Sequence, residues 1–191
     1  MACRLRRLKR DDLEMVMHWR MLPEITQFMY SDPILTVEAQ HIWFDRVSQS
    51  KHDCVWIIEL ADSGLAVGLL SLSEIEHVHM RCSWAYYIAE SAARNKGLSR
   101  SLELNIYAYV FDKLGMNKIC CEVFSSNHRV VTLHERFGAK VEGILRQHIW
   151  KNGEFLDVVQ MAILKSDWQT VSNDNQWSHE DCLIPGNALL Q

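Results

Sequence analysis

The sequence predicts an α/β (α+β) domain in which one mixed, mostly antiparallel sheet is flanked by helices. Short runs rich in β-branched and aromatic residues alternate with segments of helical apolar periodicity. The turns Asp62-Ser63-Gly64 and Lys151-Asn152-Gly153 each join two such runs, which predicts antiparallel hairpins. A chain of 191 residues, 48% of them hydrophobic, is long enough to bury a sizeable core as a single domain.

The first third is predicted to be one strand followed by three helices. Leu5 and Leu8 are set among arginines, which favours a strand, and Asp11-Asp12 precedes apolar residues spaced three and four apart. Acidic residues suit the positive end of the helix that follows. The expected elements of this third are a strand at Ala2–Lys9 and helices at Leu13–Met21, Glu24–Tyr30 and Thr36–Ser50.

The remainder is predicted to alternate strands with two helices. The helix after residue 98 is apolar nearly all round, which is typical of a buried helix, and Gly115 and Gly138 suit positions just past helix ends. The expected strands are Cys54–Leu60, Leu65–Glu76, Arg81–Ile88, Lys118–Phe124, Lys140–Trp150 and Glu154–Leu164, and the helices are Ser99–Leu114 and Asn127–Phe137. Because the chain turns polar after Trp168, we expect a domain at 1–168 and a loosely held tail at 169–191.

Composition excludes several classes of protein. The formal net charge is −4 without a dense basic tract, which argues against a nucleic-acid binder. No apolar run approaches the ~20 residues of a membrane helix, and no secretory signal is recognisable. Six irregularly spaced cysteines without a C-x-x-C pair favour reduced thiols and a cytoplasmic protein. His77 and His79 lack a third ligand at suitable spacing, so we expect no metal.

The segment Arg94-x-x-Gly97-x-Ser99 carries the clearest chemistry. A short glycine-containing loop that leads from a strand into a helix exposes unpaired N–H groups at the positive end of the helix dipole, which suits a phosphate. Lys96 and Arg100 add positive charge. The spacing alone also fits an ordinary strand-to-helix connection with solvated basic residues.

The wider pattern resembles the GCN5-related N-acetyltransferases (GNAT). It comprises Ala93-Arg94-Asn95-Lys96-Gly97-Leu98-Ser99, a long helix, the strand Ile119–Val123, Ser126-Asn127-His128-Arg129, and Phe137-Gly138-Ala139. The resemblance spans about Ala66 to Trp168 and implies the GNAT fold with acetyl-CoA as co-substrate. It assigns coenzyme binding to Ile88, Arg94, Asn95, Lys96, Gly97, Leu98, Ser99, Arg100 and Asn127. Ser99 departs from the Gly or Ala usual at the third small position of the loop.

A finer resemblance links the N-terminal third to N-acetyltransferases of pseudaminic acid biosynthesis. His18-Trp19-Arg20-x-x-Pro23-Glu24-Ile25-x-x-Phe28-Met29 carries it, together with Lys151-Asn152-Gly153-x-x-x-Asp157. It implies acetylation of the 4-amino group of a UDP-linked amino-dideoxy sugar, used for flagellin glycosylation. The acceptor residues expected on this basis are Arg20, Met29, Tyr30, His41, Arg81, Trp84 and Tyr86.

Other readings of the acceptor stay open. Ribosomal-protein and polyamine acetyltransferases have similar N-terminal segments, and the helices between Asp11 and Ser50 carry several carboxylates that a polyamine would need. A non-catalytic acyl-CoA-binding module of the same fold is a further alternative. The expected partner is a small-molecule amine, with no nucleic acid or membrane, and a homodimer is compatible with the sequence.

Acetyl transfer to an amine requires a base, an oxyanion donor and an acid for the departing thiolate. Glu122 is our candidate base, with Glu76, His77 and His79 as alternatives. The resemblance implies a backbone N–H near the end of Trp84–Ile88 as oxyanion donor. It places the acid at His134, where the family usually has Tyr. A histidine can act as an acid near neutral pH, or can simply replace Tyr in the packing.

Overall fold

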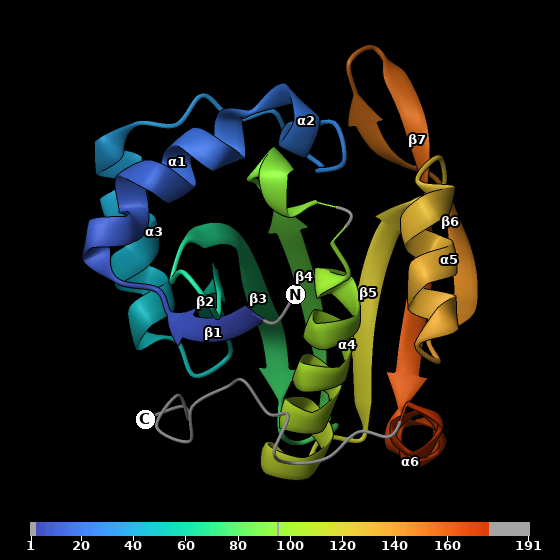
Figure 1. Cartoon of the computed structure of the whole chain (residues 1–191). Coiled ribbons are helices and arrows are strands. Elements are labelled where there is room, and N and C mark those ends of the chain that lie inside the picture. Colours follow the sequence, from blue (N-terminus) through green and yellow to red (C-terminus); the bar gives the residue numbers. More distant parts are fainter. Residues whose placement is uncertain (1–2, 95, 176–191) are drawn as a thin grey trace.

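The chain forms a seven-stranded sheet with helices on both faces, as described by a computed structural model for residues 3–94 and 96–175 (Figure 1). The strands are β1 (Cys3–Arg7), β2 (Cys54–Leu60), β3 (Ala66–Glu76), β4 (Arg81–Ile88), β5 (Lys118–Phe124), β6 (Lys140–Lys151) and β7 (Glu154–Leu164). The helices are α1 (Leu13–Met21), α2 (Pro23–Thr26), α3 (Val37–Gln49), α4 (Leu98–Ala108), α5 (His128–Arg136) and α6 (Lys165–Asp174). The expected fold class is confirmed, as is the order of the twelve predicted strands and helices, and α6 follows them as a helix that was not predicted.

The sheet order is β1-β2-β3-β4-β5-β7-β6, and every neighbouring pair is antiparallel except β4 and β5. That parallel pair is short, because it joins only Arg81–Ser83 to Lys118–Cys120. Beyond these residues the two strands separate, and Figure 1 shows β4 and β5 diverging toward the loop that leads into α4. The sheet is therefore open at its centre.

Helices cover both faces of the first half of the sheet. Trp56 and Ile58 of β2 belong to a core cluster that includes residues of α4, whereas Val55 and Ile57 pack with residues of α1 and α3. Successive side chains of a strand point to opposite faces, so α4 and the α1–α3 group lie on opposite sides. This explains why all seven residues of β2 are buried and why six of them are apolar.

Three helical segments differ from expectation in form or length, and several other ends shift by one or two residues. The buried helix ends in a π-helical turn at Tyr109–Lys113 before Gly115, which has a φ of +69°. Helix α2 is shorter than predicted: it ends at Thr26, after which Phe28 and Met29 donate to the carbonyls three residues back instead of four. Helix α6 crosses the expected boundary after residue 168, since buried Trp168 fastens its first turns to the core. Residues 176–191 of the expected tail lie outside the described residues.

The described cysteines are free thiols, and most of them are buried. Cys3, Cys54, Cys82, Cys120 and Cys121 are unpaired, and Cys182 lies outside the described part of the chain. Burial raises the pKa of the Cys3, Cys54, Cys82, Cys120 and Cys121 thiols, which keeps them protonated near neutral pH. Among residues 3–94 and 96–175, no helix has the length and apolar character needed to cross a membrane.

Candidate active site

The opening between β4 and β5 organises the candidate site. The ends of both strands lack each other as partners there, and the first turn of α4 follows the end of β4 through a short loop. Alternation along the strands places Cys121 on the α4 face and Glu122 on the other. The opening is thus lined from two sides of the sheet.

The start of α4 has the geometry of an anion site. Gly97 caps the helix with a φ of +79°, a left-handed conformation that other residues adopt only with strain. A Cβ at this position would meet no protein atom within 4 Å, so the backbone is open to close approach. Lys96 and Gly97 are exposed while Leu98 is buried and anchors the turn. These residues fit a coenzyme pyrophosphate.

Both arginines predicted at the phosphate site, Arg94 and Arg100, make hydrogen bonds to backbone carbonyls of the protein. Arg94 donates from Nε to the carbonyl of Ile88 at 2.9 Å and from Nη2 to the carbonyl of Ala89 at 2.6 Å. Arg100 donates from Nη2 to the carbonyl of Asn175 at 2.7 Å. Arg94 therefore fixes the end of β4 and Arg100 reaches the end of α6. Ser99 is half-buried next to Tyr86, and Asn95 lies outside the described residues.

Asn127 precedes α5 without capping it through its side chain. Its backbone N–H donates to Phe124 at 2.8 Å, and its carbonyl accepts from Val130 and Val131. The half-buried amide makes no hydrogen bond to the described residues that would occupy it. This arrangement leaves the Asn127 side chain available for the coenzyme role that the resemblance implies.

Glu122 and Tyr30, both expected site residues, meet on the face away from α4. The Tyr30 hydroxyl donates to Oε2 of Glu122 at 2.5 Å, and Nε2 of Gln160 donates to Oε1 at 3.1 Å. Burial, followed by the hydrogen bond and charge of Glu122, raises the pKa of Tyr30, so its hydroxyl stays a donor. Both of these donors to Glu122 are neutral groups, and the Glu122 side chain is exposed.

His134 lies on the opposite face and is 4% exposed. Its Nδ1 is 2.7 Å from Oε1 of Glu103, a fully buried carboxylate on α4. The Tyr107 hydroxyl donates to the other oxygen of Glu103. Trp84 packs edge-on against the His134 ring with the centroids 5.4 Å apart. The residue that replaces the usual Tyr is therefore part of a buried polar group that joins α5 to α4.

The other expected acceptor residues are dispersed. Met29 is half-buried beside Tyr30, and one nitrogen of the Arg20 guanidinium, Nη1, is buried without a hydrogen-bond partner in the described part of the chain. Trp84 and Tyr86 stack on each other at 5.4 Å and face α4, not the side of Glu122. Their place in the α4 core follows from the alternation of β4.

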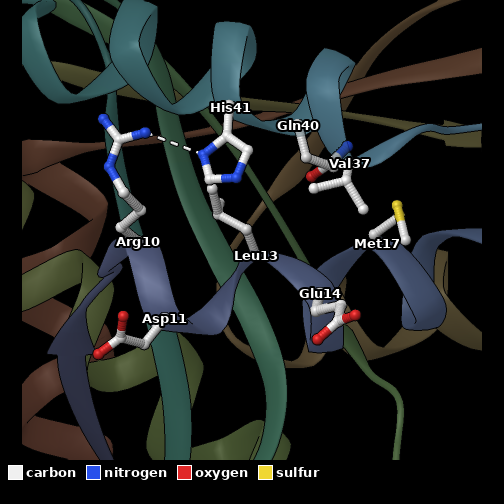
Figure 2. A pocket seen from close by; sticks show the side chains of 8 residues that line it. All are labelled: Arg10, Asp11, Leu13, Glu14, Met17, Val37, Gln40 and His41. Carbon is white, nitrogen blue, oxygen red and sulfur yellow. Dashed lines mark hydrogen bonds between the residues drawn. The ribbon is translucent and has the colours of Figure 1, made fainter.

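The contacts of His41 and Arg81 involve neither Tyr30 nor Glu122. Figure 2 shows His41 of α3 with its Nδ1 2.9 Å from Arg10, in a cavity of about 260 Å³ between α1 and α3. Arg81 begins β4, at the end of the strand opposite Ile88, and pairs with Glu76 at 3.1 Å. Arg81 and Ile88 are seven positions apart along this extended strand, a distance of about 23 Å.

Two of the alternative bases, Glu76 and His79, lie near Arg81. Glu76 also approaches His79, with Oε1 and Nε2 3.5 Å apart, at the hairpin between β3 and β4. This hairpin is at the closed end of the β4–β5 pair, away from the opening. Across the two described ranges, no three His, Cys, Asp or Glu side chains form a group that could hold a metal ion.

The fold, the opening between β4 and β5 and the Gly97 turn before α4 are together typical of an acyl-coenzyme A-dependent transferase. The comparison with known proteins supports this class. The family model described as "Acetyltransferase (GNAT) domain" matches residues 3–140. The chain belongs to the GNAT acetyltransferases.

Relatives with named activities are similar over most of the chain. A spermidine N(1)-acetyltransferase of Vibrio cholerae is 27% identical over 164 residues, which cover 86% of this chain and 94% of that protein. A spermidine N(1)-acetyltransferase of Escherichia coli is 24% identical, covering 87% and 88%. The crystal structure of the Vibrio cholerae enzyme in complex with CoA and spermine superposes with a TM-score of 0.82, at 26% identity, covering 87% of this chain and 98% of that one. The substrates named for these three relatives are polyamines, and none of the three is named for the nucleotide sugar that the finer resemblance implies.

Three residues of these sites were not expected from the sequence. Glu103 and Tyr107 lie one helical turn apart on α4. The signal that could have revealed them is a carboxylate inside a helix that is otherwise apolar nearly all round. Gln160 pairs with Glu122 across β5 and β7. That contact depends on strand register between distant segments, which no local pattern reveals.

Proposed function

We propose that this protein transfers the acetyl group of acetyl-CoA directly to a primary amine of a small molecule, and that the acceptor is a polyamine. The central observation is the opening between β4 and β5, which has the Gly97 turn on the α4 side and the Glu122–Tyr30 pair on the other. This arrangement lets a thioester and an amine approach from opposite sides. The named activities of the relatives favour spermidine or spermine.

Acetyl-CoA supplies an activated acetyl thioester, and the chain's own residues handle protons and charge. A protonated amine must lose a proton before it attacks, and Glu122 is the exposed carboxylate at the opening that can accept one. Backbone N–H groups at the unpaired end of β4 can donate to the oxyanion. The thiolate then takes a proton, for which His134 is the candidate acid.

A second candidate acceptor is the UDP-linked amino-dideoxy sugar, favoured by one observation. Nη1 of Arg20 is buried on the α1 side of β4, where the described residues give it no partner. A positive group in this state suits an anionic ligand such as a diphosphate. Four of the seven carboxylates between Asp11 and Ser50 are moreover already paired with cations, which leaves fewer for a polyamine: Asp12, Glu24, Asp32 and Asp45.

One panel separates the acceptors. Thiol release from acetyl-CoA should be measured with spermidine, spermine, a peptide amine and a UDP-4-amino-4,6-dideoxy sugar, and the products identified by mass spectrometry. Acetylated spermidine as the best product supports the proposal. Acetylated nucleotide sugar alone, with KM raised at least about tenfold in Arg20→Met, supports the second candidate. Tight coenzyme binding without any product would make the protein a non-catalytic acyl-CoA binder.

The coenzyme site has its own test. Gly97→Glu adds a negative charge where the pyrophosphate should lie, and Gly97→Ala is the matched control because both variants carry the same backbone strain. We expect calorimetry to show at least tenfold weaker acetyl-CoA binding for the glutamate variant than for the alanine variant, about 1.4 kcal/mol. Equal affinities would remove the coenzyme from this turn.

A further inference from the structure

Glu103 is a carboxylate in a place where carboxylates are rarely found. It is fully buried in the main core cluster, between α4 and the sheet. Its two oxygens have two partners, Nδ1 of His134 and the hydroxyl of Tyr107. A buried charge is costly unless it is paired and hydrogen-bonded, and a pair of this kind is often no more stable than apolar side chains of the same volume. Stability therefore gives little reason for it.

The geometry instead fixes which nitrogen of His134 carries a proton. An ionised carboxylate can only accept hydrogen bonds, so a charged Glu103 requires the proton of His134 to lie on Nδ1 in the 2.7 Å contact. Nε2 is then the atom that gains or loses a proton. Within the described residues, Nε2 has no hydrogen-bond partner that would hold its proton back. The other donor, Tyr107, holds Glu103 in position from its own helix.

We propose that Glu103 is a positioning residue that fixes the tautomer and orientation of His134, so that Nε2 delivers the proton to the departing coenzyme A thiolate. This inference rests on the proposed acetyl transfer. The amine nitrogen attacks the thioester carbon, the C–S bond breaks, and the sulfur takes the proton from Nε2 of the imidazolium. The proton that the amine has lost leaves through Glu122 and solvent, and solvent reprotonates Nε2.

The other ionisable groups around the pair do not compete for this proton. Tyr86 of β4, Cys121 of β5 and Tyr107 of α4 interact electrostatically with Glu103. Burial is the main cause that raises the pKa of each, so all three stay neutral in the working range. Trp84, which packs on the imidazole ring, carries no titratable group. A pH effect that depends on Glu103 is therefore an effect on the His134 pair.

The test uses the full chain and two readouts. Long-range ¹H–¹⁵N spectra of the imidazole, recorded without coenzyme or acceptor, should show His134 protonated at Nδ1 at every pH. In Glu103→Gln, kcat should fall at least about tenfold with KM for acetyl-CoA within twofold, since only proton delivery is disturbed. The alkaline fall of kcat should move to lower pH, because the amide lacks the charge that favours imidazolium. Glu135→Gln, on the exposed side of α5, is the matched control.

The test distinguishes failure of the Glu103 inference from failure of the proposed acetyl transfer. An Nε2–H tautomer in the wild-type protein would overturn the inference, whether or not an acceptor has been found and whether or not the variant folds. Wild-type kcat and an unchanged alkaline limb in Glu103→Gln would also overturn it and would leave Glu103 a packing feature. Failure of every amine in the panel, with the Nδ1–H spectrum present, would reject the proposed function and the delivery step together but leave the positioning contact established.

Discussion

Glu103 and Glu122 are two carboxylates on opposite faces of the same opening, and each accepts a hydrogen bond from a tyrosine. Glu103 is fully buried between His134 and Tyr107, whereas Glu122 is exposed between Tyr30 and Gln160. Burial makes the first pair rigid and its disruption costly. Exposure leaves the second pair able to exchange protons with solvent and with an amine. In our proposal the buried carboxylate positions another residue, whereas the exposed one takes part in the reaction.

The largest expected effect concerns His134, the partner of the buried carboxylate. His134→Ala should lower kcat by ~10²–10⁴, the range of a positioned general acid, with acetyl-CoA affinity nearly unchanged. His134→Tyr should restore part of the rate, since Tyr is usual there in the family. Because the acid must be protonated, kcat should fall as pH rises in the wild type. Measurement of kcat against pH for the three proteins checks this.

A wild-type kcat in His134→Ala with the same alkaline limb would contradict the role. The proton would then have to come from solvent or from another group. Tyr86, which faces α4 beside Ser99, would be the next residue to replace.

The second effect is on stability and compares the two carboxylates directly. Glu103→Ala removes one partner of a buried pair and strands His134 and Tyr107, which should cost about 3 kcal/mol of unfolding free energy. Glu122→Ala truncates an exposed side chain and should change stability by less than about 0.5 kcal/mol while still lowering kcat. Urea unfolding of both variants provides the measurement. Equal losses would mean that burial does not distinguish the two sites.

The sequence analysis named Glu122 as a candidate but missed Glu103, and the reasons for this difference are physical. Glu122 follows from alternation along one strand, and the Gly97 turn follows from local backbone chemistry. Pairing of Glu122 with Tyr30 joins segments 92 residues apart, which only the folded sheet brings together. Arg94 was expected to bind phosphate because of its charge, but the free carbonyls at the end of β4 compete for its guanidinium. Trp84 and Tyr86 were assigned to the acceptor side because the sequence does not reveal which face of β4 is covered by α4.

A third expected effect compares the two tyrosines. Tyr107→Phe leaves the buried Glu103 with one donor fewer, so it should cost about 1–2 kcal/mol of stability. Tyr30→Phe removes a donor from a carboxylate that solvent can reach, so it should cost less than about 0.5 kcal/mol. Thermal or urea unfolding of the two variants measures both losses of stability. A loss in Tyr30→Phe as large as in Tyr107→Phe would indicate that the Glu122 site closes to solvent in solution.

The smallest effect uses a third carboxylate site as a reference for pH. Glu59 and Asp12 share Arg6, with contacts of 2.6 and 2.8 Å, and Arg4 also pairs with Glu59. Although burial alone would raise them, the hydrogen bonds and charges of the arginines hold the pKa of both carboxyls below their usual range. A lowered pKa in the folded state stabilises the protein above the unfolded values of about 4, and this stability is lost as pH falls through the folded values.

Glu59→Gln should therefore lower the unfolding free energy by about 1 kcal/mol at pH 7, with the difference from wild type shrinking as pH falls below about 4. The acetylation rate per folded molecule should stay at the wild-type level, since β1 and β2 lie away from the opening. Urea unfolding at pH 7, 4 and 3 measures the first effect, and a steady-state assay at pH 7 measures the second. A difference that grows toward acid pH would mean that the arginines do not stabilise the charged form. In that case the pH dependence seen in His134 and Glu103 variants would need correction for a general loss of stability.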